Sequence, residues 1–108
     1  MSPANFVLQR ATALIMAPLV IAHLILIIAA VQGGLTGEEI LARTRGSLGW
    51  GVFYGLFVLA AAVHAGIGLQ TILREWTNLA KQPVTILSHG FMVLLIVLGG
   101  RAVYAVIA

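Results

Sequence analysis

The most unusual residue of the chain is His64, which lies in the middle of a long apolar segment and is followed by Gly66 and Gly68. An ionisable side chain at the depth of a membrane core is costly, and such residues are usually functional. A neutral imidazole is a common axial ligand of haem iron. The residues three, four and seven positions away share its helical face. Four of these six residues are small, and the whole face consists of Phe57, Ala60, Ala61, Ile67, Gly68 and Thr71. The pattern predicts a shallow trough beside the imidazole that admits the edge of a porphyrin.

A purely structural interpretation of the same face stays open. Small residues also allow helices to pack closely, and Gly51 and Gly55 fit that role. His64 would then be a packed, hydrogen-bonded histidine. We favour the haem ligand.

Two further histidines lie in apolar segments. Counted along ideal helices, His23 is roughly 20 Å from Arg10 and His64 is roughly 15 Å from Arg74. The two histidines could therefore face each other at a similar depth and form a ligand pair within one chain. The alternative, which we favour, is that His23 hydrogen-bonds a neighbouring helix or lines a polar cavity. His89 falls early in its segment, where an interfacial histidine needs no special role.

Polar residues lie where the apolar segments end. Arg10 precedes the first segment and could pair with a haem propionate, since buried charges must be paired, or polarise a quinone carbonyl. From composition alone, the favoured interpretation is an ordinary arginine that extends to the membrane surface. Arg74, Glu75 and Trp76 end the second segment. Their charges and the indole N–H could hydrogen-bond a quinone, or the three could be an interfacial anchor with a surface ion pair.

The composition indicates an integral membrane protein. The chain has 108 residues, of which 61% are hydrophobic and 8% charged, whereas soluble domains contain about 25% charged residues. Its six Lys and Arg residues are spread along the chain and form no basic stripe of the kind that binds nucleic acid. The absence of cysteine excludes disulfides, iron–sulfur ligation and thiolate-bound haem within this chain.

We predict an all-α fold with three transmembrane helices, at residues 11–31, 50–73 and 84–108, in one domain of residues 1–108. Each segment is long enough to cross a hydrocarbon core of about 30 Å. Pro18 predicts a kink in the first helix. The three segments contain no Asp or Glu, which argues against a proton-driven transporter.

The segments between the predicted spans contain residues that are typical of helix starts and ends. Thr36 and Glu39 have the spacing of a capping box, and Gly46 can end a helix, so the first loop is predicted to contain a short surface helix. Pro83 suits the first position of the third long helix.

The topology is weakly determined by charge. Each side of the membrane receives three basic residues: Arg10, Arg74 and Lys81 on the N-terminal side, and Arg43, Arg45 and Arg101 on the other. We expect a cytoplasmic N-terminus, because Glu38 and Glu39 partly offset the opposite side. The N-terminal residues lack the features of a signal or transit peptide, so a bacterial inner membrane is the expected location.

Three features resemble the membrane-anchor subunits of succinate:quinone oxidoreductases (succinate dehydrogenase, complex II), and the smaller of the two anchors, the hydrophobic membrane anchor, most closely. The segment Arg10-Ala-Thr-Ala13 opens the first span. His64-Ala-x-Ile-Gly68 lies in the second span. An acidic and an aromatic residue, Glu75 and Trp76, follow the histidine by eleven and twelve positions. The resemblance rests on the order and spacing of these features, and it extends over most of the chain.

The resemblance implies a membrane-anchor subunit that is not catalytic alone. It would hold a flavoprotein and an iron–sulfur subunit at the membrane, and it would bind haem b and quinone together with a companion cytochrome b anchor. His64 would be one axial ligand of the haem iron, with Gly68 beside the haem and Arg10 near the propionates and the quinone. The family's usual Asp-Tyr pair is Glu75-Trp76 in this chain, so the indole N–H of Trp76 would replace a tyrosine hydroxyl as donor to the quinone. The alternatives are a haem-free anchor of the fumarate reductase type, and the other, cytochrome b type of anchor.

Overall fold

The computed structural model describes all residues 1–108 and contains four helices. These are α1 (Pro3–Gln32), α2 (Gly37–Thr44), α3 (Leu48–Trp76) and α4 (Lys81–Ile107). Helices α1, α3 and α4 are long and apolar enough to cross a membrane, which confirms the all-α, three-span prediction. With 30, 29 and 27 residues, these helices are longer than the predicted spans of 21, 24 and 25 residues. Each helix is about 40–45 Å long.

Side-chain caps determine where these helices begin. Ser2 accepts a hydrogen bond from the Asn5 amide, so α1 starts two turns before the apolar segment. Ser47 accepts one from the Trp50 amide and caps α3 in the same way. The predicted surface helix is confirmed as α2, with Thr36 accepting from the Glu39 amide.

Gly46 and Pro83 lie near helix ends, as predicted from the sequence. Gly46 follows α2 with a φ of +71°, a left-handed conformation that glycine adopts without strain. The prediction that Pro83 is the first residue of the third long helix is wrong by two positions. Helix α4 begins at Lys81, and Pro83 is tolerated because the amides of a first helical turn have no partner within the helix.

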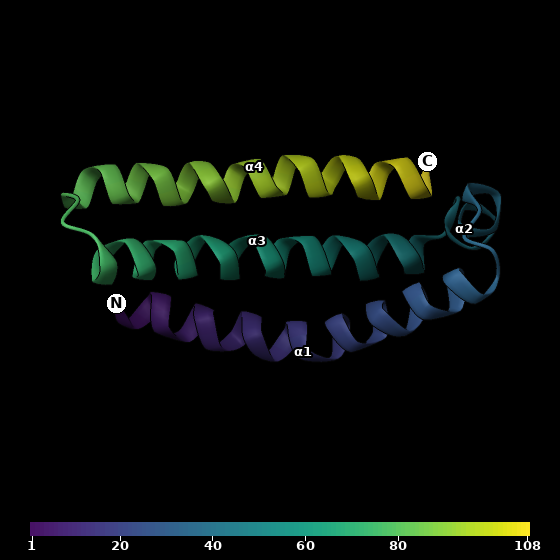
Figure 1. Ribbon diagram of the computed structural model, residues 1–108, viewed down its shortest axis with the longest axis horizontal. Helices are drawn as coiled ribbons and strands as arrows, with labels where there is room; N and C mark the ends of the chain where they lie inside the picture. The colour runs from purple at the N-terminus through teal and green to yellow at the C-terminus, as the bar shows by residue number, and fades with distance from the viewer.

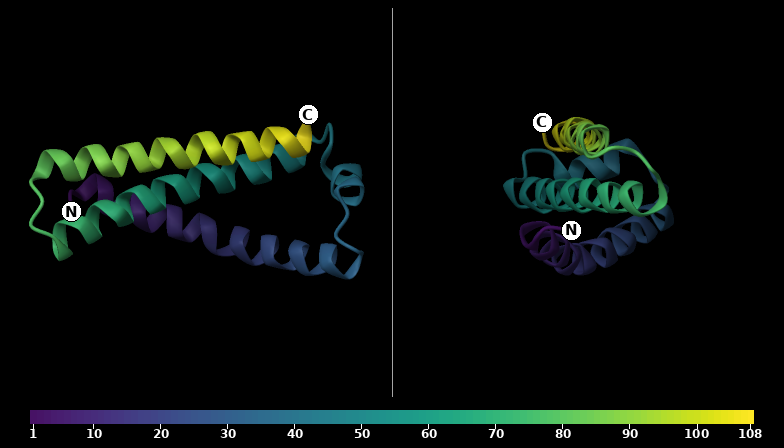
Figure 2. Two further views of the ribbon diagram at one scale, coloured as in Figure 1. Left: turned by 45° about the horizontal axis from the view of Figure 1, so that its top comes forward. Right: turned by 90° about the vertical axis from the view of Figure 1, so that its left-hand side faces the viewer.

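Helix α3 lies between α1 and α4 (Figure 1). The helices alternate in direction, and α2 lies at the end opposite the N-terminus. Helix α1 is bent near its middle, where Pro18 interrupts the backbone hydrogen bonds. Beyond the bend α1 diverges from α3, and α2 bridges the resulting gap at one end of the bundle (Figure 2).

Glycines allow α3 and α4 to pack closely. A Cβ added at Gly99 would lie 2.5 Å from a Val58 methyl, and one at Gly66 would lie 2.6 Å from the Met92 methyl. The predicted close packing at Gly51 is also present, since an added Cβ would lie 3.2 Å from Ile107, whereas Gly55 has no neighbour within 4 Å.

Only 8 of 108 residues are buried, so the chain has little internal core. Large apolar side chains are exposed along all three long helices. This surface must be covered by lipid or by other transmembrane helices.

Candidate functional site

His64 lies near the middle of α3 and contacts α1 through its Nδ1 atom. This nitrogen is 3.3 Å from Oγ1 of Thr12, a residue that is only 7% exposed. The Thr12 hydroxyl has a closer acceptor, because its oxygen lies 2.7 Å from the Leu8 carbonyl oxygen. Thr12 therefore donates its single proton to Leu8 and accepts one from Nδ1–H of His64. A hydrogen bond at Nδ1 determines the tautomer and leaves the lone pair on Nε2 free to bind a metal.

The pair is part of a row of polar contacts between α1 and α3, which we call the polar seam: Asn5, Gln9, Thr12, His64 and Gln70. Asn5 Nδ2 donates to Gln70 Oε1 over 3.2 Å. The side chain of Gln9 approaches Gly68, and its Oε1 atom is buried without a partner. The seam determines the register of α1 on α3, because Asn5 lies level with Gln70 and Thr12 level with His64.

Of these five residues, His64 alone was assigned a role from the sequence, although Thr12 lies within the segment Arg10-Ala-Thr-Ala13 that carries the family resemblance. The signal that could have revealed the seam is the spacing of Asn5, Gln9 and Thr12, since positions 5, 9 and 12 share one face of a helix.

Part of the small-residue face beside His64, where an open trough was predicted, is closed by packing within the chain. Ala60 and Ile67, on the same face, are each 4% exposed, and Gly68 faces the side chain of Gln9. The main cavity of the chain does not include His64 among its lining residues. Ala60, Ile67 and Gly68 are therefore used for packing within the chain, whereas Phe57 and Ala61, on the same face, line the cavity.

His23 and His64 are not paired. The His23 ring packs edge-on against Tyr54 and Phe57, with ring centroids 6.1 and 5.3 Å apart. Phe57 is two helical turns before His64, which corresponds to about 10 Å along α3. A ligand pair within one chain therefore does not form, and the depth count that allowed it is wrong.

His89 is exposed on α4, as expected for an interfacial histidine. The chain has no group of three or more His, Cys, Asp or Glu side chains that could hold a metal ion. A haem iron needs only axial ligands from protein, and His64 offers one.

Arg10, Glu75 and Trp76 are all exposed, and the structure does not bring them together. The register of the polar seam places Arg10 level with residues near 66, so it lies about 15 Å from Trp76 along the bundle axis. The Arg10 guanidinium lies 5.1 Å from the ring centroid of Phe6, on its own helix. Trp76, the last residue of α3, is 82% exposed. Arg10 is therefore closer to the level of His64 than to the membrane surface assumed for it.

The comparisons with known proteins identify the family. The family described as "Succinate dehydrogenase/Fumarate reductase transmembrane subunit" matches residues 4–103, nearly the whole chain. The chain belongs to this family. Searches of curated proteins and of solved structures returned no match.

Family membership gives the chain its general role. It is a multi-pass membrane-anchor subunit of the succinate dehydrogenase/fumarate reductase family, and the family implies a complex with flavoprotein and iron–sulfur subunits. The exposed apolar surface of this anchor agrees with a protein that is covered by lipid and partner helices.

Proposed function

We propose that the chain is the smaller of the two membrane anchors of a succinate dehydrogenase, and that His64 is an axial ligand of haem b. The observation that carries the proposal is the Thr12–His64 hydrogen bond, which holds the imidazole with Nδ1 protonated and Nε2 free. Metal-binding histidines characteristically donate their other ring N–H in this way.

The residues around His64 fit one half of a haem site. Haem supplies a one-electron redox centre within the membrane. Because the chain offers one suitably placed imidazole, the second axial ligand comes from the companion cytochrome b anchor. Arg10 lies about half a turn from the level of His64, where its exposed guanidinium can reach a propionate or a quinone carbonyl at the surface of the chain. Gly68 keeps the neighbouring turn of α3 free of a side chain.

The quinone contacts are proposed for the end of α3. Trp76 projects its indole N–H where α3 ends, and Glu75 precedes it. With a cytoplasmic N-terminus in a bacterial inner membrane, this end faces the docked iron–sulfur subunit, so electrons from succinate reach quinone over a short distance. Arg10 would approach such a quinone from deeper in the membrane rather than from the level of Trp76.

The proposal is tested by purifying the complex from its own membranes through a tag on this chain. We expect the flavoprotein, the iron–sulfur subunit, a second anchor and stoichiometric low-spin haem b to co-purify. The same chain expressed without the companion anchor should retain no stoichiometric haem, because one imidazole supplies only one axial ligand. A low-spin haem held by the isolated chain would contradict the division of ligands between two anchors.

One observation favours a second candidate, the haem-free anchor of a fumarate reductase type complex. The hydrogen bond to Thr12 gives the imidazole a partner within the chain, as expected for a histidine that only packs between helices. A purified complex that contains all its subunits and no haem would support this candidate.

A further inference from the structure

A cavity of about 470 Å³ lies at the end of the bundle that carries α2, and His64 is not among its lining residues. It forms where α1 diverges from α3, and α2 and α4 supply its other walls. Most of the lining side chains are apolar, including Leu26, Ile27, Phe57, Val58 and Val103. Its volume falls in the range of small-molecule sites, about 300–1,000 Å³.

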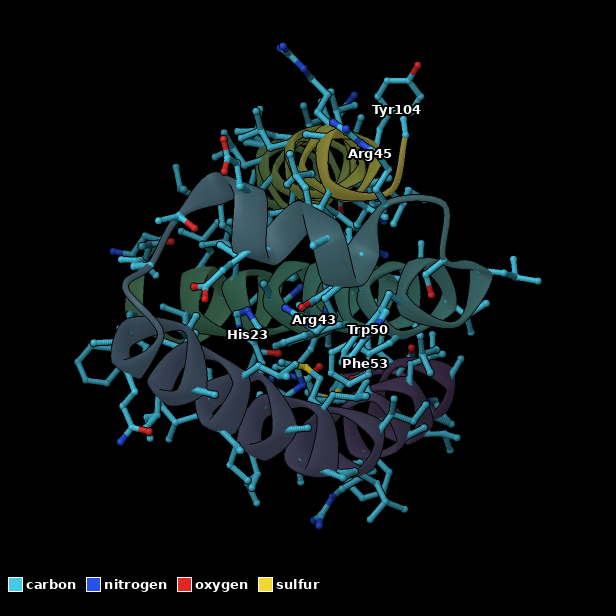
Figure 3. The ribbon with its side chains drawn as sticks, turned by 90° about the vertical axis from the view of Figure 1, so that its right-hand side faces the viewer. His23, Arg43, Arg45, Trp50, Phe53 and Tyr104 are labelled. Carbon is cyan, nitrogen blue, oxygen red and sulfur yellow. The ribbon has the colours of Figure 1, made fainter.

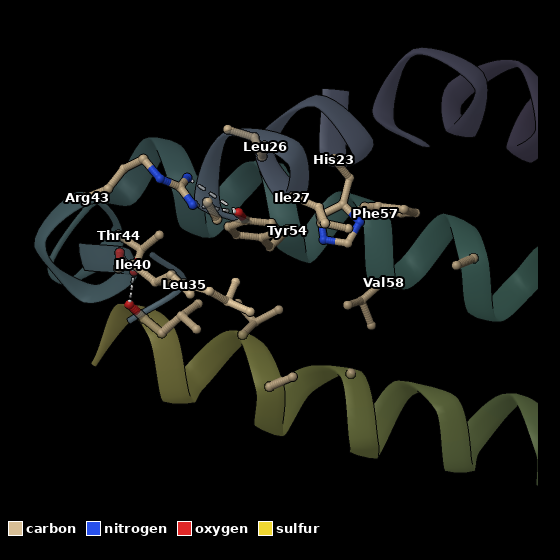
Figure 4. Close-up of a pocket in the computed structure, with 16 residues that line it drawn as sticks. His23, Leu26, Ile27, Leu35, Ile40, Arg43, Thr44, Tyr54, Phe57 and Val58 are labelled. Atoms are coloured by element: carbon tan, nitrogen blue, oxygen red, sulfur yellow. Dashed lines mark hydrogen bonds between the residues drawn. The ribbon is translucent and has the colours of Figure 1, made fainter. Parts of the chain in front are cut away.

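Arg43, Thr44 and Tyr54 lie toward the α2 end of the cavity, and His23 lies farther along it (Figure 4). Arg43 reaches inward from α2, and its guanidinium carbon lies 4.2 Å from the ring centroid of Trp50. Figure 3 shows Arg43 directed toward the interior near His23 and Trp50, whereas Arg45 lies at the outer edge beside α4. Both terminal nitrogens of Arg43 lie 3.4 Å from the Tyr54 hydroxyl oxygen.

Arg43 lacks an anionic partner in this position. The lining residues include no Asp or Glu, and the two contacts with Tyr54 are long for hydrogen bonds. A partly buried cation is stabilised by an anion that accepts its donors. Tyr54 can add a donor of its own, because its oxygen accepts from Arg43 and its proton remains available.

We propose that this cavity binds one phospholipid, with an acyl chain among the apolar side chains and the phosphate on Arg43 and Tyr54. The placement agrees with a lipid, because α2 lies between two spans and Trp50 lies in the first turn of α3, where headgroups are expected. The chemistry also agrees: guanidinium groups bind phosphate oxygens strongly, and the interior beyond Arg43 is hydrocarbon-like except for His23. The proposal does not depend on haem binding at His64.

The test compares matched variants of the purified complex. Native mass spectrometry would measure the binding of phosphatidylglycerol to delipidated complex carrying Arg43→Gln or, as control, Arg45→Gln. Both substitutions remove one positive charge at the same end of the bundle, but Arg45 does not line the cavity. We expect one tightly bound lipid in the wild type. Arg43→Gln should weaken its binding about tenfold or more, as expected for loss of a charged hydrogen-bond partner, and Arg45→Gln should bind as the wild type does.

A second pair of variants fills the cavity without changing charge. Ala30→Phe and Ala102→Phe add bulk from α1 and from α4, so each should displace the lipid independently. The haem spectrum of all variants should stay unchanged, because His64 does not line the cavity. Undiminished lipid binding in Arg43→Gln and in both filled variants would overturn the proposal. Absence of a bound lipid from the wild type, or competition by added ubiquinone, would show that a partner helix or a quinone occupies the cavity instead.

Discussion

Replacing Thr12 by valine tests whether the polar seam prepares His64 for a haem. Valine has nearly the shape of threonine but no hydroxyl, so Nδ1–H of His64 loses the acceptor that lies 3.3 Å away. An unsatisfied buried donor costs about 1–3 kcal/mol. The hydroxyl also bonds its own helix through the Leu8 carbonyl, which stays bonded within the helix after the substitution.

The expected effect on haem binding is larger than the effect on folding. Loss of the partner that orients a metal-binding histidine typically lowers metal affinity about 10–100-fold. We therefore expect Thr12→Val to release haem b from the purified complex at least about tenfold faster than the wild type, measured by transfer of haem to apomyoglobin. Thr12→Ser is the matched control, because it keeps the hydroxyl and should release haem at the wild-type rate.

If Thr12→Val retains haem as firmly as Thr12→Ser does, the hydrogen bond to Nδ1 has no part in haem binding. His64 would then be held by packing alone.

Two further predictions concern packing and the quinone. Gly99→Ala places a Cβ 2.5 Å from a Val58 methyl and should destabilise the α3–α4 contact by about 1–3 kcal/mol. Gly100→Ala, which has no neighbour within 4 Å, should not destabilise it. Thermal unfolding of the complex would separate the two variants, and equal melting temperatures would contradict the packing argument. Trp76→Phe should weaken quinone reduction by about 1–3 kcal/mol, the cost of one lost buried hydrogen bond, and leave succinate oxidation by a soluble dye unchanged. If Trp76→Phe and Arg10→Ala both reduce quinone at the wild-type rate, the quinone site lies elsewhere.

The helices were predictable because hydropathy and capping act locally. The apolar segments identified all three spans, and Thr36 with Glu39 identified α2. The predicted first helix is shorter than α1, because the apolar segment begins at residue 11 whereas helical hydrogen bonding already begins after the cap at Ser2. Polar residues such as Asn5 are helical in this protein although they lie outside the apolar segment.

From the sequence, the candidate site could be described only as far as His64, because the contacts of His64 depend on how α1 and α3 are aligned. The depth count assumed that Arg10 and Arg74 lie at one level, but the contact of Asn5 with Gln70 shifts α1 by roughly two and a half turns. That shift places His23 two turns away from His64. The cavity at Arg43 was not predicted either, because it depends on the divergence of α1 beyond its bend, which is a tertiary feature.

The most direct test of haem ligation is a reduced-minus-oxidised visible spectrum of the purified complex with and without His64. We expect the wild type to show low-spin haem b and His64→Ala to lose the haem or convert it to high spin, because one strong-field ligand is removed. His89→Ala, at an exposed position on α4, should leave the spectrum intact. A bis-histidine spectrum that survives in His64→Ala would contradict the assignment of His64 as the haem ligand.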